Sequence, residues 1–308
     1  MLRNRANSVV TCPIPVRSGE KLEVIIATRA SITKSLSCRL VNVPAILDFH
    51  NHLIPAVDDG AASLEESLGG IATMAAQGID QIITTPHLRA SLLGQRAKFD
   101  SYLADVQTSW AILAEAATRD FPQIKLWRGF EILLDVPDVD LSDPILRLAG
   151  STFALVEFPF LSVPPNSARA LDAVTKQGYS PIVAHPERYP DVQRAHELVH
   201  EWVGAGASLQ VNAGSLLGRY GPAAENAGWS LLELGVASYV CSDYHSAGAC
   251  HTGQAFDAVR GRSDDATAEL LFSVNPGRIP GSAAALPVGS VPPRKTSAFS
   301  RFWARYKS

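Results

Sequence analysis

The sequence is poor in cysteine and has no long hydrophobic run. Its 308 residues contain four cysteines, and none of them forms a Cys-x-x-Cys pair, which excludes a disulfide framework. No stretch approaches the roughly 18 apolar residues that a membrane-spanning helix needs, so an integral membrane protein is excluded. The N-terminus also lacks the apolar core and the cleavage site of a secretory signal. These absences predict a protein of the cytoplasm.

Two kinds of phosphate-handling motif are absent as well. Neither GxGxxG nor GxxxxGK[ST] occurs, so the chain has no glycine-rich phosphate loop. The residues six positions after the four cysteines are Ser18, Pro44, Ala247 and Phe256. Because none of them is an arginine, phosphate-ester chemistry with a thiolate nucleophile in a Cys-x5-Arg loop is excluded.

Negative charge is concentrated in the middle of the chain. The whole sequence has 27 Lys+Arg and 30 Asp+Glu, but residues 41–280 alone have 15 basic and 28 acidic residues, a net charge of −13. The two ends, 1–40 and 281–308, are basic. A nucleic acid requires a basic face, so this acidic body argues against a nucleic-acid ligand and favours a protein that binds cations.

The composition predicts three segments. Residues 1–44 form an N-terminal extension that we expect to be poorly ordered, 45–280 form the folded domain, and 281–308 begin as a linker rich in Pro, Ala and Ser. The last residues place Phe299, Phe302, Trp303 and Tyr306 on one face of a short basic helix. This pattern predicts that the tail makes weak contact with an anionic membrane surface. The alternatives are that the tail docks on its own domain or is disordered. Oligomeric state is not predicted.

Short β-branched runs alternate with helical stretches through the predicted domain. Strands are expected at 45–49, 81–85, 125–130, 153–158, 181–184, 208–211 and 238–241. Helices are expected near 63–77, 95–119, 167–177, 190–204, 223–234 and 252–260, and Ser63 with Glu66 forms a capping box for the first of them. This alternation predicts an α/β fold with parallel strands, as a distorted (β/α)7-type barrel. A doubly wound sheet is the alternative.

Most of the predicted strands run into a side chain that can bind a metal ion. These side chains are His50, His52, Asp58, Asp59, His87, Glu131, Glu157, His185, Asp243 and His245. The C-terminal ends of parallel barrel strands meet on one face, so we expect these residues to converge there. Imidazole and carboxylate ligands suit Mn²⁺, Fe²⁺, Zn²⁺ or Mg²⁺ in a catalytic site. His196, His200 and His251 lie elsewhere and are interpreted as bystanders.

The stretch DFHNHLIPAVDDGAASLEESL resembles the opening motif of the PHP (polymerase and histidinol phosphatase) superfamily. More narrowly, it resembles the bacterial tyrosine-protein phosphatases of the CpsB/CapC/YwqE type. The motifs TTPH, GFEI, ALVEF, PIVAHPERY, QVNAGS and CSDYH follow in the family's order, over about residues 46–277. The resemblance implies a PHP barrel and a metal-dependent protein-tyrosine phosphatase. Its substrate would be a bacterial tyrosine autokinase that controls capsule or exopolysaccharide export.

The resemblance also implies three metal ions, with manganese expected. The first ion would bind His50, His52, Glu131 and Asp243; the second Glu131, Glu157 and His185; the third Asp59, His87 and His245. Arg188 matches the family's phosphate-binding arginine. Asp58 matches the aspartate of the pair that is not a ligand, and it is expected to serve catalysis by orienting a neighbour.

The sequence departs from the family pattern at two places near the expected site. Many relatives have a second basic or polar residue after TPH, whereas Leu88 follows His87 here and Arg89 comes next. Many also have an arginine soon after the last Asp-x-His motif, whereas residues 246–253 contain none. Arg188 therefore acts alone, or Arg89 or His251 takes the second role in binding substrate. Two other functions stay open: a phosphatase of a small phosphomonoester such as histidinol phosphate, or of a phosphodiester, and a regulatory module that binds metal without activity.

Overall fold

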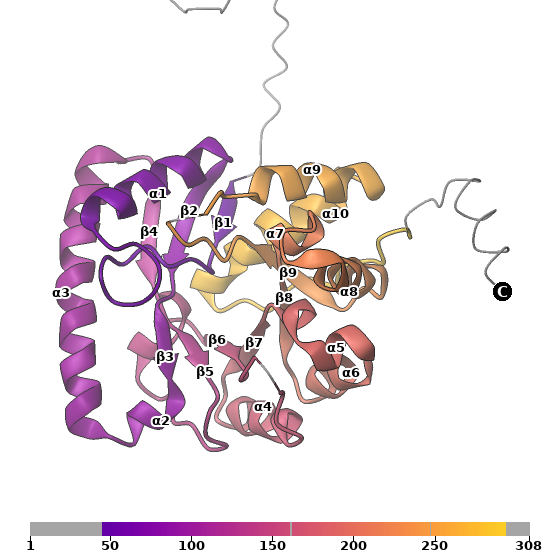
Figure 1. The fold of residues 1–308 in the computed structure, drawn as a ribbon, viewed down its shortest axis with the longest axis horizontal. Helices are drawn as coiled ribbons and strands as arrows, with labels where there is room; N and C mark the ends of the chain where they lie inside the picture. The colour runs from indigo at the N-terminus through magenta and orange to yellow at the C-terminus, as the bar shows by residue number, and fades with distance from the viewer. Residues whose placement is uncertain (1–44, 161, 247, 294–308) are drawn as a thin grey trace, which may run out of the picture. The chain divides into compact units, whose positions relative to one another are not determined.

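The computed structural model describes residues 45–160, 162–246 and 248–293 (Figure 1). The predicted N-terminal extension, 1–44, and the aromatic face of the basic tail therefore lie outside the described residues. Within the described part of the chain, no helix combines the length and the apolar composition that crossing a bilayer requires.

The strands are all parallel, as the sequence predicts. They are β1 (Ile46–Asp48), β2 (Ile79–Thr84), β3 (His87–Arg89), β4 (Lys125–Arg128), β5 (Glu131–Leu133), β6 (Phe153–Glu157), β7 (Ser180–Ala184), β8 (Ser208–Asn212) and β9 (Ala237–Cys241). A three-stranded sheet has the order β1-β2-β4, and a six-stranded sheet has the order β3-β5-β6-β7-β8-β9. The α/β class is thus confirmed. No closed barrel is detected among the described residues, so the barrel stays a prediction.

Two of the predicted strands, 81–85 and 125–130, are each followed closely by a short strand of the other sheet that was not predicted. Thr85 and Pro86 separate β2 from β3, and Gly129 and Phe130 separate β4 from β5. A Cβ atom on Gly129 would lie 3.0 Å from the Cα of Leu148 and 3.1 Å from the carbonyl oxygen of Arg147, so any other residue would force the neighbouring backbone to shift. The interruption turns the chain immediately before Glu131, a predicted ligand.

Backbone hydrogen bonds also join the ends of β1 and β9. Asp243 N donates to His50 O at 2.8 Å, and His52 N donates to Tyr244 O at 2.9 Å. Residues that are almost 200 positions apart in the sequence therefore lie side by side. This contact brings the His-x-His and Asp-x-His motifs together.

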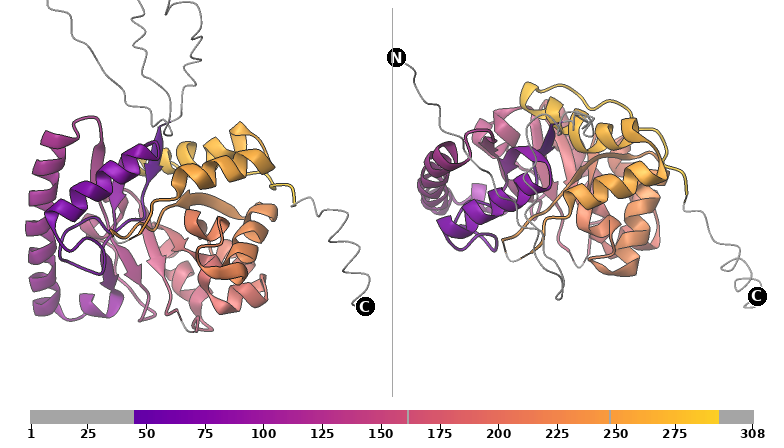
Figure 2. Two further views of the ribbon diagram at one scale, coloured as in Figure 1. Left: turned by 45° about the horizontal axis from the view of Figure 1, so that its top comes forward. Right: turned by 90° about the horizontal axis from the view of Figure 1, so that it is seen from above.

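The helices lie on the outer side of the sheets (Figure 2). They are α1 (Leu64–Ala76), α2 (Ala90–Leu93), α3 (Arg96–Asp120), α4 (Ser167–Lys176), α5 (Pro190–Arg194), α6 (Glu197–Gly204), α7 (Ala213–Leu216), α8 (Gly221–Glu233), α9 (Thr252–Arg262) and α10 (Asp265–Glu269). Four short 3₁₀ segments (Pro144–Leu146, Leu148–Gly150, Pro186–Arg188 and Pro276–Gly281) and a π-helical turn (Leu270–Val274) complete the elements.

The helix predictions hold except at one break and a few short elements. The Ser63 cap is confirmed, because Ser63 Oγ accepts from Glu66 N at 3.2 Å; the reciprocal bond of a capping box is shifted by one residue, since Glu66 Oε2 accepts from Ala62 N at 2.9 Å. The helix expected over 190–204 is two helices, because Ala195 is extended between them. The turns α2, α7 and α10 were not predicted, since segments of four or five residues are too short for helical periodicity.

The core has two apolar clusters, and successive strand residues alternate between them. In β6, for example, Ala154 and Val156 belong to the larger cluster and Phe153 and Leu155 to the smaller one. Both faces of the strands are thus buried, which explains why they read as short apolar runs instead of alternating polar and apolar residues.

Residues 282–293, part of the predicted linker, contact the domain at several points. Leu286 N donates to Asn275 Oδ1 at 2.7 Å, and Val291 N donates to Leu232 O at 3.0 Å. The Val291 side chain is buried. The described part of this segment therefore packs on the domain, while the boundary near residue 280 stays a prediction.

Candidate metal centre

Nine side chains at the strand ends gather into four overlapping groups, and they are the nine that the resemblance implies as metal ligands. The groups are His52, Asp59, His87 and His245; His50, His185 and Asp243; His50, His52 and Glu131; and His87, Glu131 and Glu157. In each group, one ligand atom from every residue lies within 4.8 Å of the others. Among the described residues, no such group includes His196, His200 or His251, in line with their interpretation as bystanders.

Glu131 lies at the centre of this cluster. Its Oε1 is 3.1 Å from His50 Nε2 and 3.0 Å from His185 Nε2. Its Oε2 is 3.0 Å from His87 Nδ1 and 3.5 Å from His52 Nε2. The carboxylate is buried, so a single negative group is shared by four imidazole rings out of contact with bulk water. A carboxylate surrounded by imidazoles in this way would be a ligand for divalent cations bound in the cluster.

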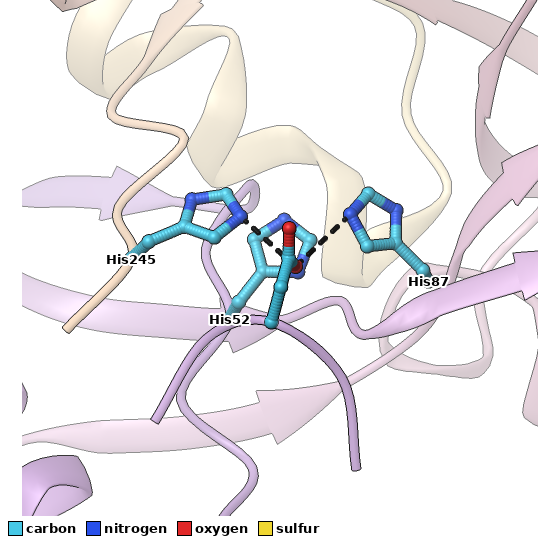
Figure 3. A group of neighbouring side chains, drawn as sticks. His52, His87 and His245 are labelled. Atoms are coloured by element: carbon cyan, nitrogen blue, oxygen red, sulfur yellow. Dashed lines mark ion pairs between the residues drawn. The ribbon is translucent and has the colours of Figure 1, made fainter. Parts of the chain in front are cut away.

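A second part of the cluster is open to solvent. Asp59 Oδ1 lies 3.4 Å from His87 Nε2 and 3.3 Å from His245 Nε2, and Figure 3 shows these histidines on either side of His52. The Asp59 side chain is 70% exposed, whereas Glu131 is buried. The centre therefore has a closed side around Glu131 and an accessible side around Asp59.

The Asp58-Asp59-Gly60 loop reaches the cluster because of its glycine. A Cβ atom on Gly60 would lie 2.1 Å from the carbonyl oxygen of His52, so no other residue fits there. Ala61 N donates to that same oxygen at 3.0 Å. The tight turn holds Asp59 beside the histidines, and it explains why a glycine follows the two aspartates in the sequence.

In the motif His50-Asn51-His52, one ring nitrogen of each histidine contacts a neighbouring side chain, which leaves the other ring nitrogen available for a metal ion. His50 Nδ1 lies 2.8 Å from Gln210 Oε1, and His52 Nδ1 lies 2.7 Å from Asp58 Oδ2. The Nε2 atoms of both rings are buried and have no hydrogen-bond partner among the described residues. Imidazoles that bind a metal through one nitrogen typically donate from the other in this way. The arrangement thus fits a divalent cation.

Charge in the cluster also favours cations. Burial alone would lower the pKa of His50, but the carboxylates of Glu131 and Asp243 raise it to about 10. Burial would likewise lower the pKa of His87, but its contacts with Glu131 and Glu157 raise it to about 11. The same contacts outweigh burial at Glu131 and hold its pKa well below the usual range. Glu131 is therefore anionic, and a bound cation can take the place of the histidine protons.

Two residues of the QVNAGS motif position ligands, although the sequence analysis assigned them no role. Gln210 Nε2 donates to Asn212 Oδ1 at 2.9 Å, and Asn212 Nδ2 donates to Asp243 Oδ2 at 2.7 Å. A chain of side chains thus connects His50 to Asp243. The signal was present, because both residues are polar and lie two positions apart in an apolar strand, on one face.

Asp48 ties the two motifs together through their backbones. Its carboxylate accepts from His50 N at 3.2 Å and from Ser242 N at 2.7 Å. The backbone is unusual at two predicted ligands, since φ is +35° at His185 and +52° at Asp243. Positive φ is uncommon for residues other than glycine and is concentrated at functional sites. The fold therefore holds these side chains in specific positions.

Arg188 and Arg89 lie on different sides of the centre. Arg188 Nη1 donates to Asp243 Oδ2 at 2.8 Å, which puts its guanidinium at the edge of the cluster. Arg89 lines a groove of about 560 Å³ together with Asp59, His87 and Lys98. The structure thus places one arginine against a ligand and the other in the groove next to the open side.

Comparisons with known proteins agree with this picture. A family model described as "Capsular polysaccharide synthesis, CpsB/CapC" matches residues 46–280. The tyrosine-protein phosphatase YwqE of Bacillus subtilis (strain 168) is 29% identical over 201 residues, 65% of this chain and 78% of the relative. The tyrosine-protein phosphatase CpsB of Streptococcus pneumoniae is 26% identical over 243 residues, 76% of this chain and 98% of the relative.

A solved structure has the same fold. It is described as one of the crystal structures of YwqE from Bacillus subtilis and CpsB from Streptococcus pneumoniae, "unique metal-dependent tyrosine phosphatases". The TM-score is 0.68 at 23% identity, and the match covers 81% of this chain and all of the other.

Proposed function

Because the chain belongs to the CpsB/CapC family of capsular polysaccharide synthesis proteins, we propose that it is a metal-dependent protein-tyrosine phosphatase. The observation that carries the proposal is the joint cluster of nine imidazole and carboxylate ligands with Arg188 at its edge. Divalent cations supply, when bound, Lewis-acid stabilisation of phosphoryl oxygens and a water of lowered pKa. The nitrogen and oxygen donors fit such ions, and we infer that the site takes three, with manganese as the metal.

Arg188 has the contacts expected of a phosphoryl clamp. It makes one side-chain hydrogen bond among the described residues, to Asp243, and a guanidinium has five N–H donors. The remaining donors can bind a phosphoryl group as its equatorial charge grows during transfer. The leaving group of phosphotyrosine is a phenolate with a pKa of about 10, so it requires little help from a general acid.

Asp58 acts, in this proposal, by orienting His52 and the loop around it. Two contacts support this role. Asp58 Oδ2 lies 2.7 Å from His52 Nδ1, and Asp58 Oδ1 accepts a hydrogen bond from Gly60 N at 3.0 Å. Burial would raise the pKa of Asp58, but the hydrogen bond and charge of His52 lower it below the ordinary value. An anionic Asp58 holds the His52 tautomer that keeps Nε2 free.

The open side of the centre favours a protein substrate over a small metabolite. Asp59 is 70% exposed, and the groove beside it contains Arg89 and Lys98, which suits a phosphopeptide with acidic neighbours. We propose that the substrate is a bacterial tyrosine autokinase in capsule or exopolysaccharide regulation, that the protein acts in the cytoplasm, and that the two sheets belong to a distorted PHP barrel.

The proposal is tested with the full-length chain loaded with Mn²⁺. We expect hydrolysis of a phosphotyrosine peptide to be faster than that of histidinol phosphate, and elemental analysis to find bound metal. His50→Ala abolishes activity in this proposal, while His200→Ala, at an exposed position of α6, leaves it unchanged.

Two results would contradict it. Faster turnover of histidinol phosphate would point to a small-molecule phosphatase. Bound metal without hydrolysis of p-nitrophenyl phosphate would indicate a regulatory module.

A further inference from the structure

Two exposed aromatic rings lie against Arg188. The guanidinium carbon is 4.5 Å from the centre of the Tyr220 ring and 5.6 Å from that of Phe160. Tyr220 is 42% exposed and Phe160 is 51% exposed. Among the described residues, these are the only aromatic side chains in the set of exposed large hydrophobic residues. Both of them therefore lie at Arg188, which contacts the predicted ligand Asp243.

Separate parts of the chain hold these rings in place. Phe160 follows β6, and the loop is anchored next to it because Phe158 N donates to the buried Tyr189 Oη at 2.9 Å. Tyr189 directly follows Arg188, so this bond connects the Phe160 loop to the arginine. Tyr220 precedes the first residue of α8, on the segment that joins α7 to α8.

Tyr220 stays neutral at physiological pH. Burial, and then the charge of Asp243, raise its pKa to about 12. The ring therefore presents no negative charge to a phosphoryl group on Arg188. Its partial exposure leaves room for a ligand to pack against it.

We infer that Phe160 and Tyr220 form a subsite that binds the aromatic ring of an aryl phosphate while Arg188 holds its phosphoryl group. This inference rests on the proposed function, because it names the feature by which that site prefers phosphotyrosine over alkyl phosphates. Aromatic pairs prefer offset or edge-to-face packing at 4.5–7 Å between centres, which gives each ring a favourable contact with a bound phenyl group.

Binding of two phosphonates tests the subsite without turnover, since their carbon–phosphorus bond is not hydrolysed. Phenylphosphonate carries the ring, and methylphosphonate carries only the phosphoryl-like head. We expect the full-length, Mn²⁺-loaded protein to bind phenylphosphonate more tightly in a calorimetric titration. Phe160→Ala and Tyr220→Ala should each weaken phenylphosphonate binding roughly 2- to 10-fold and leave methylphosphonate binding unchanged.

Two control variants separate the ring from its surroundings. Tyr220→Phe keeps the ring and should bind phenylphosphonate like the unaltered protein. Leu234→Ala removes another exposed hydrophobic side chain, at the far end of α8, about 20 Å along the helix, and should change neither affinity.

Equal weakening of both phosphonates in the alanine variants would overturn the inference, because the rings would then only position Arg188. Unchanged affinities, or a protein with no preference for phenylphosphonate, would overturn it as well. The proposed function is tested separately. If the protein selects phenylphosphonate but hydrolyses no phosphomonoester, the subsite stands and the proposed function fails. If it hydrolyses phosphotyrosine without this selectivity, the proposed function stands and the subsite fails.

Discussion

Single buried polar residues organise this site. Glu131 is shared by four imidazoles, and Gln210 and Asn212 connect His50 with Asp243. A buried polar group that lacks a partner destabilises the protein, so each of these side chains must have its contacts satisfied by the protein or by a bound cation. His50 Nε2 and Glu131 Oε2 lie 3.1 Å and 3.0 Å from neighbouring side chains but make no hydrogen bond of suitable geometry within the described part of the chain, so a bound cation would satisfy them.

The role of Gln210 gives a prediction at this scale. Gln210→Leu removes the acceptor for His50 Nδ1 and the donor to Asn212. Residues that orient a metal ligand typically change metal affinity or activity 10- to 100-fold when replaced, so we expect a loss of roughly that size. Competition with a chromophoric chelator measures Mn²⁺ affinity.

The matched control is Gln107→Leu, at an exposed position of α3. A melting curve of the metal-free variant checks that it folds. Unaltered Mn²⁺ affinity in folded Gln210→Leu would show that the contact with His50 does not position the ligand.

Short breaks between consecutive strands bring the motifs together as much as the strands themselves do. The breaks between β2 and β3 and between β4 and β5 let His87 and Glu131 start new strands, where they pair in register. The predicted strands end at residues 85 and 130, so β3 and β5 were not predicted, because strands of three residues are too short to show a recognisable period. Gly129 was the local sign of the second break.

Gly129→Ala tests this account of the second break. The added Cβ would lie 3.0 Å from the Leu148 backbone, which cannot move as a side chain could. Overpacking of this kind costs about 1–3 kcal/mol, and we expect urea denaturation to show a loss of unfolding free energy in that range. Mn²⁺ affinity should also fall, because Glu131 follows two residues later.

Gly69→Ala provides the control, since a Cβ there has no atom within 4 Å and alanine favours the α1 helix. This variant should be as stable as the unaltered protein or more so. Equal stability of Gly129→Ala and Gly69→Ala would refute the steric explanation of the break.

At the scale of the whole molecule, the described C-terminal segment is part of the packed domain. Asn275 holds it through two hydrogen bonds with the backbone of Leu286, and Arg262 Nη2 donates to the carbonyl oxygen of Pro292 at 3.0 Å. A composition rich in Pro, Gly, Ala and Ser predicts a linker, but it does not reveal that an asparagine elsewhere binds the segment's backbone.

Shortening the chain at two points tests the contribution of this segment. Ending it after Gly281 removes the buried Val291, and full burial of such a side chain stabilises by roughly 1.5–3 kcal/mol. We expect a loss of that size in the free energy of unfolding, measured by denaturant titration. Ending the chain after Pro293 should have a much smaller effect. If the two shortened chains are equally stable, the segment contributes nothing to the domain.

Residue types and their spacing along the chain were enough to predict metal-binding chemistry and the parallel α/β class. The His-x-His and Asp-x-His motifs and the other polar residues at the strand ends predict the metal ligands, and the alternation of short apolar runs with helical stretches predicts strands whose C-terminal ends carry them. These are local properties, since residue type and spacing within a few positions decide them.

Which ligand atoms lie close enough to one another to bind the same ion became clear only from the folded structure. The resemblance implies His52 as a ligand with His50, whereas the structure also groups it with Asp59, His87 and His245. The links from Gln210 to His50 and from Phe160 and Tyr220 to Arg188 likewise join distant positions. Such contacts depend on strand register, on breaks within strands and on the paths of loops. Those are set by the packing of the whole domain, which spacing along the chain does not encode.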